Sequence, residues 1–197
     1  WVTLEDELSQ AEDEPVGMLR VRAPHAFGQE QLLSPLTQFL ERYPQLSVEW
    51  MLNDKTVNFL SDNIDCAIRV GAEVDSSTVS VLLAEVPRCL VASPALLARV
   101  APVTRPALLS ALPWVALSTF YQHDIVLTHA LSGEQERVAI TPRLYTDSLY
   151  VARNTALAGL GVAAVSSWTV EEDIRQGKLV ALLHDWQPAP LPVHLVA

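Results

Sequence analysis

Short strand-like segments alternate with short helix-like segments along this chain, and the alternation begins again near its middle. Residues 19–23 and 46–50 alternate apolar with polar side chains, as half-buried strands do, and the leucines between them recur at helical spacing. A short helix is expected at residues 57–60, and residues 65–71 form a third strand that runs into a turn. Strands and helices that alternate at short range are typical of α/β units with a mostly parallel sheet.

The second half of the chain repeats this arrangement and predicts a second α/β lobe. A hairpin is expected around Ser132-Gly133-Glu134. Gly161, after the helix expected at residues 147–158, is expected to supply the positive φ that turns the chain. The remaining elements are expected strands at residues 88–92, 114–117, 162–165 and 179–183, and expected helices at residues 93–97, 106–113 and 168–176.

Composition and charge exclude several classes of protein. Half of the 197 residues are apolar, which excludes a disordered chain, and no apolar run reaches the length of a membrane span. The net charge is −10, and residues 1–15 hold acidic residues but no basic one. A chain of this charge without a basic stripe repels phosphate, so we expect these residues not to bind nucleic acid themselves. The two cysteines suit a reducing compartment and are expected to act as small buried hydrophobes.

The N-terminal segment carries one apolar stripe. Trp1, Leu4, Leu8 and Ala11 follow one another at steps of three and four, which is the spacing of a coiled-coil seam. An ordinary helix lying on its own domain fits the same pattern about as well. The chain starts at a tryptophan and ends in a strand-like run, so we expect it to be a fragment of a longer polypeptide.

Sequence motifs of catalysis are absent from the chain. It has no glycine-rich phosphate loop, no GxSxG, no HExxH and no CxxC, and its five histidines lack the spacing of metal ligands. We therefore expect no catalytic residue, no metal site, no cofactor and no enzymatic activity.

A series of short motifs resembles the effector-binding domain of LysR-type transcriptional regulators. Each motif is weak alone, but they occur in the order of that family and together cover residues 17–197. They are the stretches at residues 17–28, 35–44, 65–71, 75–77, 90–94, 158–163 and 177–180, among them Asp65-Cys66-Ala67-Ile68-Arg69-Val70-Gly71 and Ala158-Gly159-Leu160-Gly161-Val162-Ala163.

The resemblance implies the fold of type 2 periplasmic binding proteins, in which two Rossmann-like α/β subdomains are joined by two crossing strands. Residues 15–87 with 189–197 would form subdomain I and residues 88–188 subdomain II, while residues 1–14 would end the linker helix through which such regulators dimerise. The family's winged helix-turn-helix is absent from this chain. The implied function is sensing of a small-molecule effector, usually an organic acid. The resemblance also implies a cytoplasmic homodimer or homotetramer, which binds DNA only through the missing domain and does not bind membranes. The alternative is an exported solute-binding protein of a transporter.

Ligands of such sheets bind beyond the carboxyl ends of the strands, and this rule selects the candidate site residues. Many family members have a serine or threonine just after the first strand, where this chain has Pro24, so the usual hydroxyl contact to the ligand is lost. Ser118 and Thr119 are expected to replace that contact, Phe120 to stack on an aromatic effector, and Arg69 either to bind the ligand or to form a structural ion pair. The full set of candidate ligand-binding residues is Pro24, His25, Phe27, Asn53, Lys55, Thr56, Arg69, Val70, Gly71, Ser118, Thr119, Phe120, Asp147 and Ser148.

Overall fold

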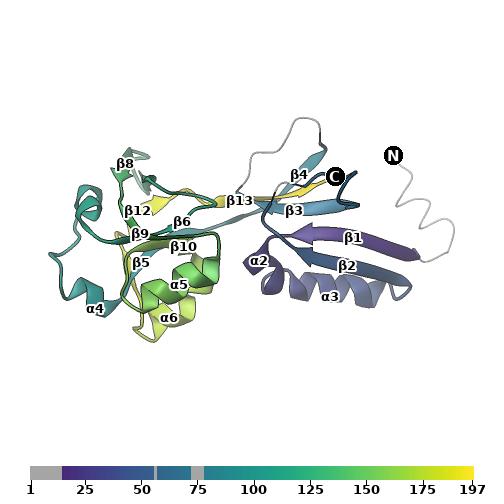
Figure 1. Ribbon diagram of the computed structural model, residues 1–197, viewed down its shortest axis with the longest axis horizontal. Coiled ribbons are helices and arrows are strands. Elements are labelled where there is room, and N and C mark those ends of the chain that lie inside the picture. Colours follow the sequence, from purple (N-terminus) through teal and green to yellow (C-terminus); the bar gives the residue numbers. More distant parts are fainter. Residues whose placement is uncertain (1–14, 56, 72–77) are drawn as a thin grey trace. The chain divides into compact units, whose positions relative to one another are not determined.

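The chain divides into two compact α/β units in a computed structural model that describes residues 15–55, 57–71 and 78–197 (Figure 1). Unit 1 holds the described residues up to Leu83 together with Val193–Ala197, and unit 2 is Ala84–Pro192. The chain passes between the units twice, within the strands β4 (Ser80–Val86) and β13 (Leu191–Val196). The apolar stripe expected at residues 1–14 and the motif at residues 75–77 lie outside the described residues.

Unit 1 is built on a five-stranded sheet in the order β2-β1-β3-β13-β4. The strands β1 (Gly17–Ala23), β2 (Leu46–Leu52) and β3 (Cys66–Val70) confirm the three strands expected in the first half. β1 pairs in parallel with both β2 and β3, whereas β13 runs antiparallel to β3. The carboxyl ends of β1, β2 and β3 therefore lie at one edge of the sheet, as the sequence predicts.

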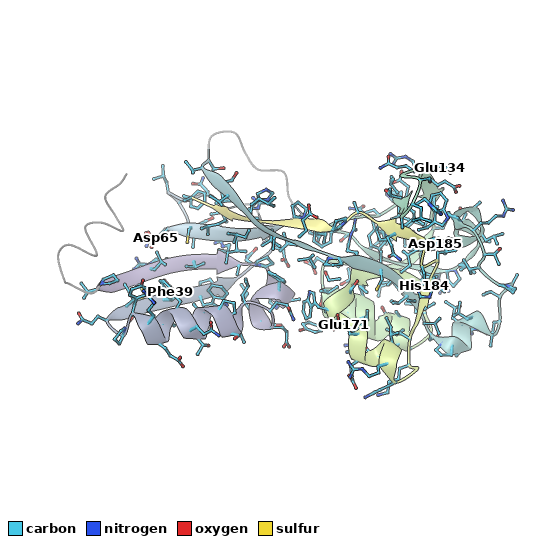
Figure 2. All side chains as sticks on the ribbon, turned by 180° about the vertical axis from the view of Figure 1, so that it is seen from behind. Phe39, Asp65, Glu134, Glu171, His184 and Asp185 are labelled. Carbon is cyan, nitrogen blue, oxygen red and sulfur yellow. The ribbon has the colours of Figure 1, made fainter. Side chains whose placement is uncertain are left out.

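Two helices, α2 (His25–Gln29) and α3 (Leu33–Arg42), follow β1 and lie along one side of this sheet (Figure 1). The Trp50 indole on β2 donates to the Gly28 carbonyl in α2 at 3.0 Å, which fixes α2 against the sheet. Phe39, labelled in Figure 2, belongs to α3, and its ring meets that of Tyr43 edge-on at 5.2 Å.

The short helix expected at residues 57–60 is wrong, because this stretch forms turns. The Asp62 carboxylate accepts from the Asn58 amide at 3.0 Å, and the Asn58 side chain accepts from the Ser61 amide at 3.2 Å. Side chains of this type compete with the backbone bonds of a helix, and Asn63 at φ 54° completes the turn.

Unit 2 contains three small sheets. In the first sheet, β5 (Arg88–Ala92) lies between β10 (Ala163–Ser166) and β11 (Val180–Leu182). In the second, β7 (Asp124–His129) lies between β8 (Gln135–Ala139) and β12 (Trp186–Pro188). In the third, β6 (Trp114–Leu117) pairs with β9 (Pro142–Thr146). The hairpin expected around residues 132–134 is confirmed as β7 and β8. The expected mostly parallel sheet is wrong here, because β5 is antiparallel to both of its neighbours and only β6 with β9 forms a parallel ladder.

The helices of unit 2 are shorter than the sequence pattern suggests. The helix expected at residues 106–113 is a 3-10 helix over Pro106–Ala111, and the one expected at residues 168–176 is a 3-10 turn over Ser167–Thr169 followed by α6 (Glu171–Arg175). The other two are α4 (Pro94–Leu97) and α5 (Leu149–Leu157).

Gly159, and not Gly161, turns the chain after α5. Gly159 has φ 85°, and Gly161 is not among the residues of positive φ. A Cβ on Gly161 would lie 2.9 Å from the backbone carbonyl group of Pro113 and from the Trp114 carbonyl carbon. Gly161 therefore permits a close approach of two backbones, which is a different use of the same property, the missing side chain.

Candidate functional site

Two backbone amides donate hydrogen bonds at the edge of the unit 1 sheet where β1 and β2 end. Ala23 pairs with Leu52 at the last step of the ladder, and beyond it the Asn53 amide donates to the Ala23 carbonyl at 2.9 Å. The Asp54 carboxylate accepts from the His25 amide at 3.1 Å. The structure thus brings Pro24 and His25 beside Asn53, and Asp54 already occupies the first free amide of α2.

The other candidates of unit 1 differ in exposure. His25 and Lys55 are exposed, Pro24, Phe27 and Asn53 are half-buried, and Thr56 lies outside the described residues. Arg69, Val70 and Gly71 end β3, which is parallel to β1, so they reach the same edge of the sheet. Gly71 has φ 74° and turns the chain there.

In unit 2, one backbone carbonyl group connects the carboxyl ends of two neighbouring strands. β6 and β9 are parallel, with Leu117 opposite Thr146 at their carboxyl ends. The Thr146 carbonyl accepts from the Ser118 amide at 2.8 Å and from the Ser118 hydroxyl at 3.1 Å. Ser118 therefore uses its own donors to tie the two strand ends together, a task that its position in the sequence did not reveal.

Asp147 and Ser148 follow β9 and start α5 beside this edge. Ser148 is the N-cap of α5: its side chain accepts from the Val151 amide at 3.2 Å, and its own amide donates to the Thr146 hydroxyl at 3.1 Å. The predicted start of a helix at this point is confirmed, and it places Asp147, which is exposed, next to Ser118.

Thr119 and Phe120 differ in the chemical group that they can offer to a ligand. Thr119 is exposed, and among the described residues its hydroxyl has no hydrogen-bond partner. Phe120 is half-buried against the larger apolar cluster of unit 2. It also lines a cavity of about 230 Å³, whose other walls are Arg88, Tyr121, Asp124, Ile125, Val126, Thr128, Gln135 and Ala189.

The guanidinium group of Arg88 lines this cavity. Arg88 is not among the candidate residues selected from the sequence. Its Nε donates to the Ala189 carbonyl at 2.8 Å, and burial lowers the pKa of its guanidinium, which Tyr121 partly offsets. None of the ion pairs formed by the described residues includes Arg88. The only feature of the sequence that could have drawn attention to Arg88 is its position at the start of an apolar strand.

A model of the LysR substrate-binding domain matches residues 12–197. The chain belongs to the LysR substrate-binding domain family. Among its relatives, the HTH-type transcriptional regulator PtxR of Pseudomonas aeruginosa is 30% identical over 187 residues, which are 93% of this chain and 60% of PtxR. The HTH-type transcriptional activator TtdR of Escherichia coli K12 is 28% identical over 194 residues, which are 93% of this chain and 59% of TtdR.

Solved structures of LysR-type proteins share the fold of this domain. The full-length Vibrio cholerae virulence activator AphB has a TM-score of 0.79 at 25% identity, over 98% of this chain and 68% of AphB. CrgA, a LysR-type transcriptional regulator from Neisseria meningitidis, has a TM-score of 0.76 at 23% identity, over 98% of this chain and 65% of CrgA. The expected periplasmic-binding-protein-like fold is confirmed.

PtxR and TtdR are transcriptional regulators, the class that the sequence motifs led us to expect for the relatives of this domain. The chain spans about three fifths of the length of PtxR and TtdR. Within the described residues, no helix is long and apolar enough to cross a membrane, and no three side chains among His, Cys, Asp and Glu gather as metal ligands do.

Proposed function

We propose that this domain senses a small organic acid on behalf of a LysR-type transcription regulator, and that effector binding alters the DNA binding of the regulator's oligomer. The observation that carries the proposal is the match to the LysR substrate-binding domain over residues 12–197. The arrangement of the strand ends supports it, because open α/β sheets bind ligands beyond their carboxyl ends.

The proposed effector contacts come from the candidate residues at the carboxyl edges of the two units. In unit 2 the exposed Thr119 hydroxyl offers the free polar contact, while Ser118 holds the edge in shape. Phe120 offers half-buried aromatic surface to an apolar part of the effector. In unit 1 the contacts are Arg69, Val70 and Gly71 at the end of β3, and Pro24, His25, Phe27, Asn53, Lys55 and Thr56 after β1 and β2; Asp147 and Ser148 complete the set.

The remaining properties concern the whole regulator. We propose that it is a cytoplasmic homodimer or homotetramer without enzymatic activity, and that it binds DNA through an N-terminal domain outside this chain. The net charge of −10 supports the view that the 197 residues themselves do not hold duplex DNA.

The experiment that tests the proposal is a thermal-stability screen of the 197-residue chain against small carboxylic acids and uncharged compounds of similar size. A ligand present at about 100 times its Kd adds roughly 2.7 kcal/mol to the free energy of unfolding, because it binds only the folded state. We expect at least one acid to raise the melting temperature in a saturable manner. A screen in which no compound does so contradicts the proposed function.

Thr119→Val should weaken binding of the acid found in that screen by about five- to 150-fold. The substitution keeps the shape of the side chain but removes one hydrogen bond worth about 1–3 kcal/mol. Isothermal titration calorimetry measures the effect, with Thr104→Val, a change at another exposed threonine of unit 2, as the control. Equal affinity of the parent and Thr119→Val would remove Thr119 from the site.

A further inference from the structure

Basic side chains gather on one face of the unit 1 sheet, and within the described residues some of their nitrogen atoms have no partner. Arg69 on β3 lies directly opposite His194 on β13, and directly opposite residues of an antiparallel pair project from the same face. Arg22 on β1 lies beside Ala67, two residues before Arg69, so it belongs to the same face. This is the side of the sheet away from Trp50 and α2, since Trp50 pairs with Val21 on the alternate face.

Among the described residues, two carboxylates at this face are already in use. Glu49 on β2 lies opposite Arg20, two residues before Arg22, and forms an ion pair with it at 3.2 Å. Asp62 forms an ion pair with Arg22 at 3.3 Å and also accepts from the Asn58 amide. Asp65, labelled in Figure 2, precedes β3 at its other end and accepts from the Arg20 amide at 2.7 Å. No ion pair or hydrogen bond to the Arg69 side chain is present among the described residues.

His194 adds a second unsatisfied group beside Arg69. Its Nδ1 atom is buried and has no hydrogen-bond partner within the part of the chain that the structure describes, and the same holds for the Nε atom of Arg22. Buried polar atoms in folded proteins nearly always have a partner, so an orphan next to an unpaired guanidinium points to an acceptor supplied from outside the chain.

A carboxylate is the acceptor that fits both groups. Its two oxygens match the parallel N–H donors of a guanidinium, and a remaining lone pair can accept from an imidazole N–H. A lone carbonyl or hydroxyl would leave the charge of Arg69 without a counter-ion.

We propose that Arg69 and His194 together hold the carboxylate of the effector. The proposal rests on the effector-binding function proposed above and adds to it a residue, His194, and the chemical group that is recognised. Arg69 supplies the charge and His194 sets the orientation, because the two residues are fixed opposite each other by the β3–β13 ladder. The ligand class is therefore acids, and the matching amides are excluded.

The test is calorimetry on the 197-residue chain with pairs of probes of equal shape, benzoate with benzamide and succinate with succinamide, plus any acid found in the stability screen. We expect acids to bind and amides not to bind. Arg69→Met should weaken acid binding by about ten- to 150-fold, the range for a hydrogen bond to a charged group. Arg105→Met, at an exposed arginine of unit 2, should leave it unchanged.

His194 is tested by two variants that differ in one donor. Asparagine can place an N–H close to the position of the imidazole Nδ1, whereas leucine cannot. We expect His194→Leu to weaken acid binding about tenfold and His194→Asn to retain most of it. The ring signals of His194, assigned by their loss in His194→Leu, should shift on addition of the acid but not of the amide.

The outcomes separate the two proposals. Acid binding that Arg69→Met and His194→Leu leave unchanged, or amide binding equal to acid binding, overturns the carboxylate anchor and leaves the effector-binding function standing. Binding of uncharged compounds alone overturns both the carboxylate anchor and the organic acid as effector, and leaves standing only the binding of a small molecule. A chain that binds no small molecule at all overturns both proposals.

Discussion

Asp173→Asn should lower the free energy of unfolding of unit 2 by about 3–5 kcal/mol, the range measured when one partner of a buried ion pair is removed. The Asp173 carboxylate accepts from Arg153 twice, from Nε at 2.7 Å and from the second terminal nitrogen at 2.8 Å. The Asp173 side chain is only 6% exposed and that of Arg153 28%. Asparagine fills the same volume, so the loss reports the charge left unpaired on Arg153.

The control for Asp173 is its neighbour on the same helix. Glu172 pairs with Arg175, but both side chains are more than half exposed. Such pairs contribute about 0–1 kcal/mol, so Glu172→Gln should have little effect. In thermal unfolding the Asp173 variant should melt roughly 6–20 °C lower, at about 2–4 °C per kcal/mol. A loss below 1 kcal/mol for Asp173→Asn would show that the pair does not hold α6 to α5.

Tyr121→Phe should cost unit 2 about 2–6 kcal/mol, because it leaves two buried backbone groups without partners at about 1–3 kcal/mol each. The Tyr121 hydroxyl donates to the Val115 carbonyl at 2.5 Å and accepts from the Ala164 amide at 3.0 Å, so it links β6 to β10. Tyr43→Phe, at a half-buried tyrosine of unit 1, is the comparison. Equal stabilities of the two variants in urea unfolding would contradict the proposed link.

The same tyrosine makes the stability of unit 2 sensitive to alkaline pH. Burial raises the pKa of Tyr121 to about 12 from 10.0, and backbone hydrogen bonding to Ala164 and Leu117 and the charge of Arg88 offset part of that rise. The contribution of the neutral phenol, about 3 kcal/mol for a shift of this size, is complete below pH 10. It is lost as the pH rises from about 10 to about 12, and Tyr121→Phe should not show this slope.

The sequence predicted those parts of the fold that depend on local patterning. Apolar alternation located β1 and β2, and helical spacing located α3. It did not predict β4, because β4 is an edge strand whose pairing with β13 joins distant parts of the chain. Strand direction in unit 2 depends on the same kind of long-range pairing, so the antiparallel neighbours of β5 were not foreseen.

The sequence predicted where the candidate site lies, but not which of its hydroxyl groups are already hydrogen-bonded within the protein. The rule about strand ends brought together Ser118 and Asp147, and Pro24 and Asn53. Nothing local indicates that the Ser118 hydroxyl is used by the Thr146 carbonyl while Thr119 stays free. His194 was missed for a similar reason, because its meaning comes from Arg69, which lies opposite it only after the sheet has formed.

Backbone amide NMR of the 197-residue chain, titrated with the acid found in the stability screen, tests whether the strand ends form the effector site. We expect the largest chemical-shift changes at the carboxyl edges of the strands, on residues 118–120 and 147–148 in unit 2 and on residues 24–27 and 69–71 in unit 1. Changes confined to other surfaces, such as α3 or α6, would show that the acid binds elsewhere and would contradict the assignment of these edges as the effector site.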